Sequence, residues 1–171
     1  GGAGSIGSFV VKDLFKFKVK KIIIVDNNEY NLFKLKLSLT KKNIDKIELN
    51  LANIENNFQI KKIFKKYFPD IVFHVAALKH VEYLENNTNQ GILTNILGTD
   101  NILKYSVKNK VKYFINVSTD KAADPENILG ITKLIGEYLC NNYSLKNNIK
   151  IGIVRFGNVF NSNGSVSEVF K

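Results

Sequence analysis

The chain lacks methionine and tryptophan, and it has only one cysteine and one arginine among its 171 residues. The lone cysteine, Cys140, excludes an internal disulfide, and the helical apolar pattern around it indicates an inert core thiol. No apolar run is long enough to span a bilayer, and no secretory signal precedes the opening glycines. We therefore expect a cytoplasmic domain without a membrane segment in this chain, although a membrane anchor upstream in the parent protein stays open.

The shortage of arginine also indicates which kind of macromolecule the chain is expected to bind. The net charge of +10 comes almost entirely from lysine, and Arg155 is the only arginine. The lysines are spread over the whole length among asparagine and isoleucine, which is typical of solvated helix faces. Proteins that read base edges usually depend on arginine. We therefore expect no nucleic-acid partner.

The absence of methionine suggests that the chain is a fragment. Its first residue already lies in a glycine loop, and in dinucleotide-binding folds such a loop follows a β-strand. We expect the chain to lack this first strand and most of the C-terminal substrate domain. The domain prediction is a dinucleotide-binding domain over 1–157, followed by the start of a substrate-binding region over 158–171.

Short apolar runs typical of buried parallel strands alternate with segments of helical periodicity. The predicted strands cover 21–26, 46–51, 71–76, 113–118 and 150–156. The predicted helices cover 5–18, 29–40, 55–68, 88–108 and 127–145. In the third helix we expect the following side chains to face inward: Phe58, Ile60, Ile63, Phe64 and Phe68. This alternation predicts an α/β fold with a Rossmann-type, doubly wound parallel sheet.

The opening glycines form a dinucleotide-binding pattern, because they lead directly into a helix whose free N–H groups and dipole can hold a pyrophosphate. Asp26 ends the next strand about 20 residues on, where such folds place a carboxylate on the adenosine ribose. Its charge would repel a 2′-phosphate, so NAD is the expected cofactor, with NADP possible beside the nearby lysines. The alternative is a glycine turn with a helix-capping aspartate. The cofactor-binding candidates in this region are Gly1, Gly4, Ser5, Ile6, Gly7 and Asp26.

Reactive side chains follow the fourth predicted strand. Thr119, Asp120 and Lys121 bring a hydroxyl, a carboxylate and an amine to the carboxyl end of that strand, where ligands bind in such sheets. The alternative is a strand-end turn with a helix cap. Short-chain dehydrogenases pair a tyrosine with a lysine four residues later. Lys133 fits the lysine, but Leu129 stands at the tyrosine position and cannot exchange a proton.

The segments together resemble the CapD-like polysaccharide-biosynthesis family of nucleotide-sugar dehydratases, within the extended short-chain dehydrogenase/reductase superfamily. The matching segments are 1–7, 26–32, 69–74, 76–81, 94–99, 118–122 and 155–159. The branch with an apolar residue at position 129 resembles the UDP-N-acetylglucosamine 4,6-dehydratases. The chain departs from the family pattern at Asn53, Glu82, Thr88 and Asn163.

The resemblance implies a catalytic cycle in which hydride leaves C4 of a UDP-sugar, water is lost across C5 and C6, and hydride returns to C6. It implies that Asp120 is the acid for the C6 hydroxyl, so we expect burial to raise its pKa above the ordinary value of about 3.9. Lys121 would act in its neutral form as the C5 base. Thr119 would bind the C4 oxygen, and Lys133 would hold the nicotinamide ribose.

The resemblance also implies further ligand contacts. The cofactor candidates are Ala76, Ala77 and Asn95, and the substrate candidates are Lys79, His80 and Asn158. Helix packing is the alternative for Asn95, a solvated loop for Lys79 and His80, and a turn for Asn158; His74 is expected in the core.

The sequence predicts an NAD(P)-dependent lyase with no metal, and a homo-oligomer for the complete protein. The alternatives are a nucleotide-sugar 4-epimerase or ketoreductase, which Leu129 disfavours, and an inactive fragment that keeps only the dinucleotide-binding fold.

Overall fold

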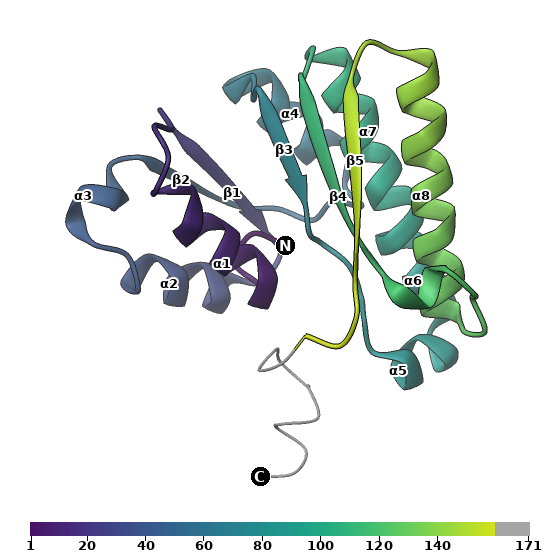
Figure 1. Cartoon of the computed structure of the whole chain (residues 1–171). Helices are drawn as coiled ribbons and strands as arrows, with labels where there is room; N and C mark the ends of the chain where they lie inside the picture. Colours follow the sequence, from purple (N-terminus) through teal and green to yellow (C-terminus); the bar gives the residue numbers. More distant parts are fainter. Residues whose placement is uncertain (160–171) are drawn as a thin grey trace, which may run out of the picture. The chain divides into compact units, whose positions relative to one another are not determined.

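The computed structural model describes residues 1–159 and divides the chain into two compact units, Gly1–Asn53 and the residues from Ile54 onward (Figure 1). The expected start of a substrate-binding region after residue 157, including Asn163, lies almost entirely outside the described residues. Among residues 1–159, no helix combines the length and the apolar character needed to cross a membrane.

The first unit is a two-stranded parallel sheet with helices. Its elements are α1 (Ser5–Leu14), β1 (Ile22–Asp26), α2 (Glu29–Leu37), α3 (Lys41–Ile44) and β2 (Ile47–Leu51). Ile22 lies opposite Ile47, and Asp26 lies opposite Leu51. Every second residue of β1 is buried, as expected for a strand with one face in a core. That core consists of Ala3, Val11, Ile22, Ile24, Leu32 and Leu35.

The second unit is a three-stranded parallel sheet in the order β3-β4-β5. Its strands are β3 (Ile71–His74), β4 (Tyr113–Thr119) and β5 (Lys150–Phe156). Its α-helices are α4 (Asn57–Tyr67), α5 (Val81–Asn86), α6 (Thr88–Gly91), α7 (Thr99–Lys108) and α8 (Ile128–Lys146). A π-helical segment, η1 (Ile92–Gly98), joins α6 to α7, and a 3₁₀ turn, η2 (Asp120–Ala122), follows β4.

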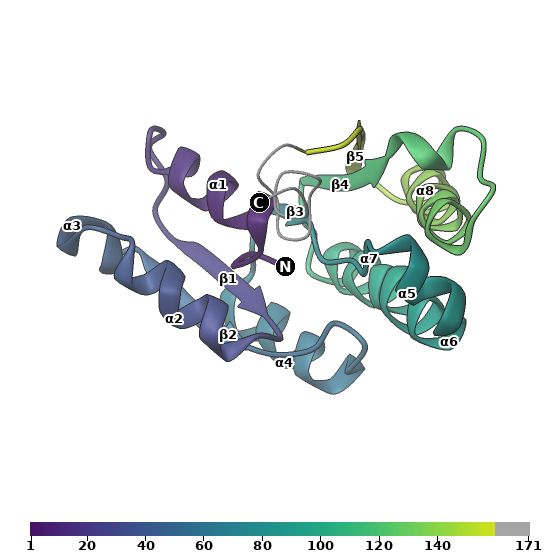
Figure 2. The same cartoon turned by 90° about the horizontal axis from the view of Figure 1, so that it is seen from below.

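Helices α7 and α8 lie on the same side of this sheet (Figure 2). Alternate residues of β4 are therefore buried, with Phe114, Asn116 and Ser118 each less than 5% exposed. The buried face becomes more polar toward the carboxyl end of β4. The strand thus carries its polar side chains to the end where η2 begins.

The predicted alternation of strands and helices is confirmed, and all strand pairs are parallel. The pairing forms two sheets, β1-β2 and β3-β4-β5, where the sequence predicts one. Helix α1 ends at Leu14 and not at residue 18. The predicted helix over 29–40 ends at Leu37, and a separate turn, α3, follows it.

The predicted inward face of the third helix is partly wrong. Ile60 and Phe64 are buried, but Phe58 and Phe68 are 73% and 66% exposed. Phe58 lies in the first turn, which begins at the Asn56 cap, and points away from the Ile60–Phe64 stripe. Phe68 follows the last helical residue in a left-handed conformation with φ 45°, so it leaves the helical face.

The predicted long helix over 88–108 contains the π-helical segment η1. Gly98 closes this segment and packs against Ile54, because a Cβ at position 98 would lie 2.5 Å from Ile54 Cδ1. Such segments accommodate one extra residue per turn and often occur at functional sites. Helix α5 was not predicted, because its six residues show no clear periodicity.

Candidate active site

In the first unit, Asp26 braces the glycine loop against the end of β1. Its Oδ2 accepts a hydrogen bond from Ala3 N at 2.9 Å, and its Oδ1 accepts one from Asn28 N at 3.0 Å. Gly2 N also donates to Val25 O at 3.0 Å. A carboxylate oxygen can accept more than one hydrogen bond. The buried Asp26 therefore holds the loop in place and keeps acceptor capacity for a ribose hydroxyl.

The turn into α1 requires glycine. A Cβ at Gly7 would lie 2.1 Å from Gly1 O and 2.7 Å from Gly2 Cα, so no larger residue fits. The helix then begins at Ser5 and Ile6 after an N-cap glycine, Gly4, which provides no side-chain cap. The first turn of α1 contains no acidic residue. A helix start of this kind favours an anionic group such as a diphosphate, so these residues fit the predicted dinucleotide.

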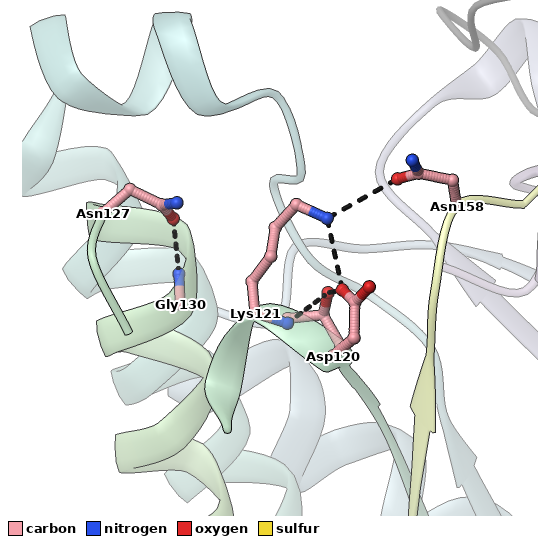
Figure 3. Close-up of polar contacts among 6 residues, drawn as sticks. Asp120, Lys121, Asn127, Gly130 and Asn158 are labelled. Carbon is pink, nitrogen blue, oxygen red and sulfur yellow. Dashed lines mark hydrogen bonds and ion pairs between the residues drawn. The ribbon is translucent and has the colours of Figure 1, made fainter. Parts of the chain in front are cut away.

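In the second unit, the reactive side chains come together where β4 ends (Figure 3). Thr119 Oγ1 donates to Asp120 Oδ1 at 2.9 Å, and Lys121 Nζ lies 3.2 Å from the same oxygen. Lys121 Nζ also donates to Asn158 Oδ1 at 3.5 Å, which brings in the residue two positions after β5. Thus Thr119, Asp120, Lys121 and Asn158 form one cluster at the carboxyl ends of two adjacent strands.

The expectation of a raised pKa for Asp120 is wrong for this structure. The Asp120 side chain is 56% exposed and not buried. Hydrogen bonds from Thr119 and Lys121 to its carboxylate lower its pKa from the ordinary value. The turn is also partly a capping turn, because Thr119 Oγ1 accepts a hydrogen bond from Lys121 N.

Lys133 lies one helical turn after Leu129 on α8, and both residues are buried. Its Nζ donates a hydrogen bond of 2.6 Å to Val117 O, near the carboxyl end of β4. Burial lowers the pKa of Lys133 to about 8, against the opposing influence of Cys140 and Glu137. Two further protons of its ammonium group are available for other acceptors.

The start of α8 packs directly against the Lys121 backbone. Asn127 caps the helix by accepting from Gly130 N at 2.9 Å (Figure 3). A Cβ at Gly130 would lie only 2.4 Å from Lys121 O and 3.1 Å from Pro125 Cα. Glycine at position 130 therefore sets how closely η2 approaches the helix.

Asn95 holds the segment that follows β3. Its Oδ1 accepts from Leu78 N at 2.9 Å, while its Nδ2 donates to Leu78 O and to Thr132 Oγ1, both at 3.1 Å. The fully buried amide thus ties the Leu78 backbone, directly after the half-buried Ala76 and Ala77, to Thr132 on α8. These contacts fit the packing alternative, and the predicted contact of Asn95 with a cofactor stays a prediction.

The remaining sequence candidates lie further along the same segment. Lys79 and His80 are exposed, and the His80 ring packs edge-on against Tyr83 with centroids 6.1 Å apart. His74 is buried and hydrogen-bonded to Thr99 Oγ1 at 2.9 Å, as expected for a core histidine. Burial, with a contribution from the charge of Lys133, places the pKa of His74 well below its usual value.

One network was missed by the sequence reasoning. Glu137 accepts from Ser118 Oγ at 2.6 Å, from Arg155 Nε at 2.9 Å and from Arg155 Nη2 at 2.7 Å. Burial would raise the pKa of Glu137, but the hydrogen bonds from Arg155 and Ser118 outweigh it and lower the pKa. The available signal was the position of Glu137 one turn after Lys133, together with the only arginine in the chain.

Three features define a Rossmann-type α/β protein: the glycine loop, the carboxylate that ends the following strand, and the polar cluster at parallel strand ends. Within residues 1–159, no three histidine, cysteine, aspartate or glutamate side chains gather as they would around a metal ion. The family model for "Polysaccharide biosynthesis protein" matches residues 1–171. The chain belongs to this family, which confirms the CapD-like assignment made from its motifs.

Two relatives show how the chain compares with longer proteins. It is 41% identical to an uncharacterised membrane protein of Methanocaldococcus jannaschii and 34% identical to a UDP-N-acetylglucosamine 4,6-dehydratase (inverting) of Campylobacter jejuni. Both alignments cover 100% of this chain and 51% of the relative. The chain therefore spans about half the length of these relatives.

Two solved structures show the same fold. Pen from Bacillus thuringiensis superposes with a TM-score of 0.92 at 34% identity, over 99% of this chain and 52% of that one. UDP-glucuronic acid 4-epimerase from Bacillus cereus, crystallised with NAD, gives a TM-score of 0.79 at 25% identity, over 94% and 55% of the two chains.

Proposed function

We propose that the protein carrying this chain is a nucleotide-sugar 4,6-dehydratase that converts UDP-N-acetylglucosamine to the 4-keto-6-deoxy sugar for glycan biosynthesis. The observation that carries the proposal is the Thr119–Asp120–Lys121 cluster at the end of β4, next to a helix that has Leu129 at the tyrosine position. The similarity to the Campylobacter jejuni dehydratase supports the choice of substrate.

The proposed cofactor is NAD, which supplies the hydride acceptor and donor when bound. The tight turn at Gly7 and the buried, loop-bracing Asp26 support binding of its diphosphate and adenosine ribose. The NAD in the epimerase structure supports the same choice. NADP is the second possibility. Ala76 and Ala77 are proposed to line the cofactor, and Lys133 to donate to the nicotinamide ribose.

The ion pair of Asp120 and Lys121 can supply both proton-transfer groups. Dehydration needs a protonated Asp120 and a neutral Lys121, which together hold the same protons as the observed pair of carboxylate and ammonium. Their atoms already lie 3.2 Å apart, so one proton passing from Nζ to Oδ1 produces both active forms. A sugar that covers the pair would favour the neutral forms, because desolvation penalises charge.

The elimination step then restores the starting pair. Over the whole cycle, the proton lost from the C4 hydroxyl when hydride leaves C4 balances the proton that C5 gains when hydride adds to C6. Neutral Lys121 takes the proton from C5, while protonated Asp120 gives its proton to the leaving C6 hydroxyl, which departs as water. Lys121 is again an ammonium and Asp120 a carboxylate. Thr119 is proposed to bind the C4 oxygen. Asn158, which contacts Lys121 Nζ, is proposed to contact the substrate, as are Lys79 and His80.

The experiment uses the complete protein with UDP-N-acetylglucosamine and product mass spectrometry. The wild-type product is expected to have lost one water. Asp120→Asn and Lys121→Met should each slow water loss by at least about 100-fold, the usual size of a general acid or base contribution, while the cofactor stays bound. Near-normal activity in either variant would refute the role given to that residue.

A matched control is available in the same sheet. Asp70 and Lys112 form an exposed ion pair of 2.9 Å near the amino ends of β3 and β4. Lys112→Met removes a lysine ion pair as Lys121→Met does, but away from the cluster. We expect it to keep wild-type activity.

The second candidate function is a nucleotide-sugar 4-epimerase, which the fold similarity to the Bacillus cereus epimerase favours. An epimerised product would have the same mass as the substrate. Leu129 argues against this function, because it cannot exchange the C4 hydroxyl proton.

Oligomerisation stays a prediction for the complete protein.

A further inference from the structure

Glu137 connects three elements of the second unit through one buried carboxylate. It lies on α8, Ser118 is near the end of β4, and Arg155 is near the end of β5. Three hydrogen bonds of 2.6 to 2.9 Å converge on its two oxygens. The Glu137 side chain is only 8% exposed.

Each residue bound to Glu137 is close in sequence to the cluster. Ser118 directly precedes Thr119, and Arg155 lies three positions before Asn158. Glu137 itself is one helical turn after Lys133, whose Nζ is bonded to Val117 O in the same strand. The network is therefore one layer below the reactive side chains of β4, β5 and α8.

The chemistry of the network requires a carboxylate. The planar guanidinium of Arg155 donates one hydrogen bond to each carboxylate oxygen of Glu137. This paired geometry fixes the relative orientation of the two groups as well as the distance between them. A glutamine at position 137 could accept from Ser118 but would turn an N–H group toward one arm of the guanidinium. The only arginine of the chain is thus used to join two strand ends to a helix.

We propose that Glu137 is a positioning residue that locks the ends of β4 and β5 to α8 and so sets the Thr119–Asp120–Lys121 cluster against Asn158 and Lys133. It touches no reacting atom. Its effect is expected on the rate of the chemical step, because displacement of reactive groups by about 1 Å can cost about 100-fold in rate. The inference rests on the proposed function only because the test measures kcat for the proposed reaction.

The test compares Glu137→Gln, Ser118→Ala and the control Asp70→Asn in the complete protein. Asp70 also joins neighbouring strands through an ion pair, but at the opposite end of the sheet. We expect Glu137→Gln to lower kcat by roughly tenfold or more with KM changed less than about threefold, the pattern of an interaction needed in the transition state. Asp70→Asn should change neither constant.

Thermal unfolding of each variant separates positioning from stability. If Glu137→Gln does not fold, Ser118→Ala carries the test, because it removes one hydrogen bond and no charge; we expect its kcat to fall about threefold or more. An unchanged kcat in a folded Glu137→Gln or Ser118→Ala protein would overturn the proposal. If the wild-type enzyme epimerises its substrate, the dehydratase assignment fails, but the same comparison of kcat still tests Glu137 on that reaction.

Discussion

Replacement of Gly130 by alanine tests how closely α8 must approach the reactive turn. The new Cβ would lie 2.4 Å from Lys121 O, whereas ordinary contact begins at 3.4 Å. The obstructing atom belongs to the backbone, and Pro125 Cα is also close at 3.1 Å. The η2 turn and the helix must therefore separate by about 1 Å, because neither side can rotate away.

The expected result of Gly130→Ala is a loss of both activity and stability. Overpacking of this kind typically costs about 1–3 kcal/mol. A displacement of Lys121 by about 1 Å should lower kcat about 100-fold. Product formation from UDP-N-acetylglucosamine in the complete protein, together with a urea unfolding curve, measures the two effects.

Gly136→Ala is the matched control on the same helix. A Cβ at position 136 would meet its nearest neighbours, Asn95 O and Thr99 Cγ2, at 3.6 and 3.9 Å, which is ordinary contact. Alanine is better than glycine in a helix interior by about 1 kcal/mol, so this variant should be at least as stable as the wild type with unchanged kcat. A Gly130→Ala protein with wild-type kcat would refute the reasoning.

Two further predictions follow from buried charges. Because the pKa of Lys133 is lowered to about 8 in the folded state, the unfolded chain binds more protons between pH 8 and 10.5, so this residue makes stability rise with pH in that window. Lys133→Met should flatten the rise in urea unfolding curves measured from pH 7.5 to 10, and an equally steep rise in the variant would contradict the assignment. Asp26→Asn replaces one of the two carboxylate oxygens that accept backbone N–H bonds, one buried from Ala3 and one part-buried from Asn28, so it should destabilise the protein by about 1.5–3 kcal/mol and weaken NAD binding, as measured by calorimetry. Unchanged stability and affinity would show that Asp26 does not brace the loop.

Local sequence patterns predicted the five strands, the longer helices and the end of the sheet where the cluster lies, but not the short helices α3 and α5. Short apolar runs located the five strands to within about two residues at each end. The glycine pattern predicted a tight turn into the first helix, and the structure shows that this turn has no room for a side chain at Gly7. The placement of Thr119, Asp120 and Lys121 followed from the rule that ligands bind at the carboxyl ends of parallel strands.

The errors came from properties that depend on tertiary contacts. Phe58 and Phe68 belong to an apolar pattern, but the helix begins and ends too close to them for either to reach the core. The state of Asp120 depends on solvent exposure and on the Lys121 ammonium, which sequence does not reveal. Glu137 was missed because its partners are 18 and 19 residues away along the chain.

The central claim is that Lys121 removes the C5 proton while Asp120 protonates the departing C6 hydroxyl. The most direct measurement is the product mass after the complete protein reacts with UDP-N-acetylglucosamine in deuterium oxide. The account predicts a product that has lost one water and carries a solvent deuterium at C5, and it predicts that Lys121→Met forms this product at least about 100-fold more slowly. A product of unchanged mass carrying no deuterium at C5, or full C5 labelling with Lys121→Met, would contradict it.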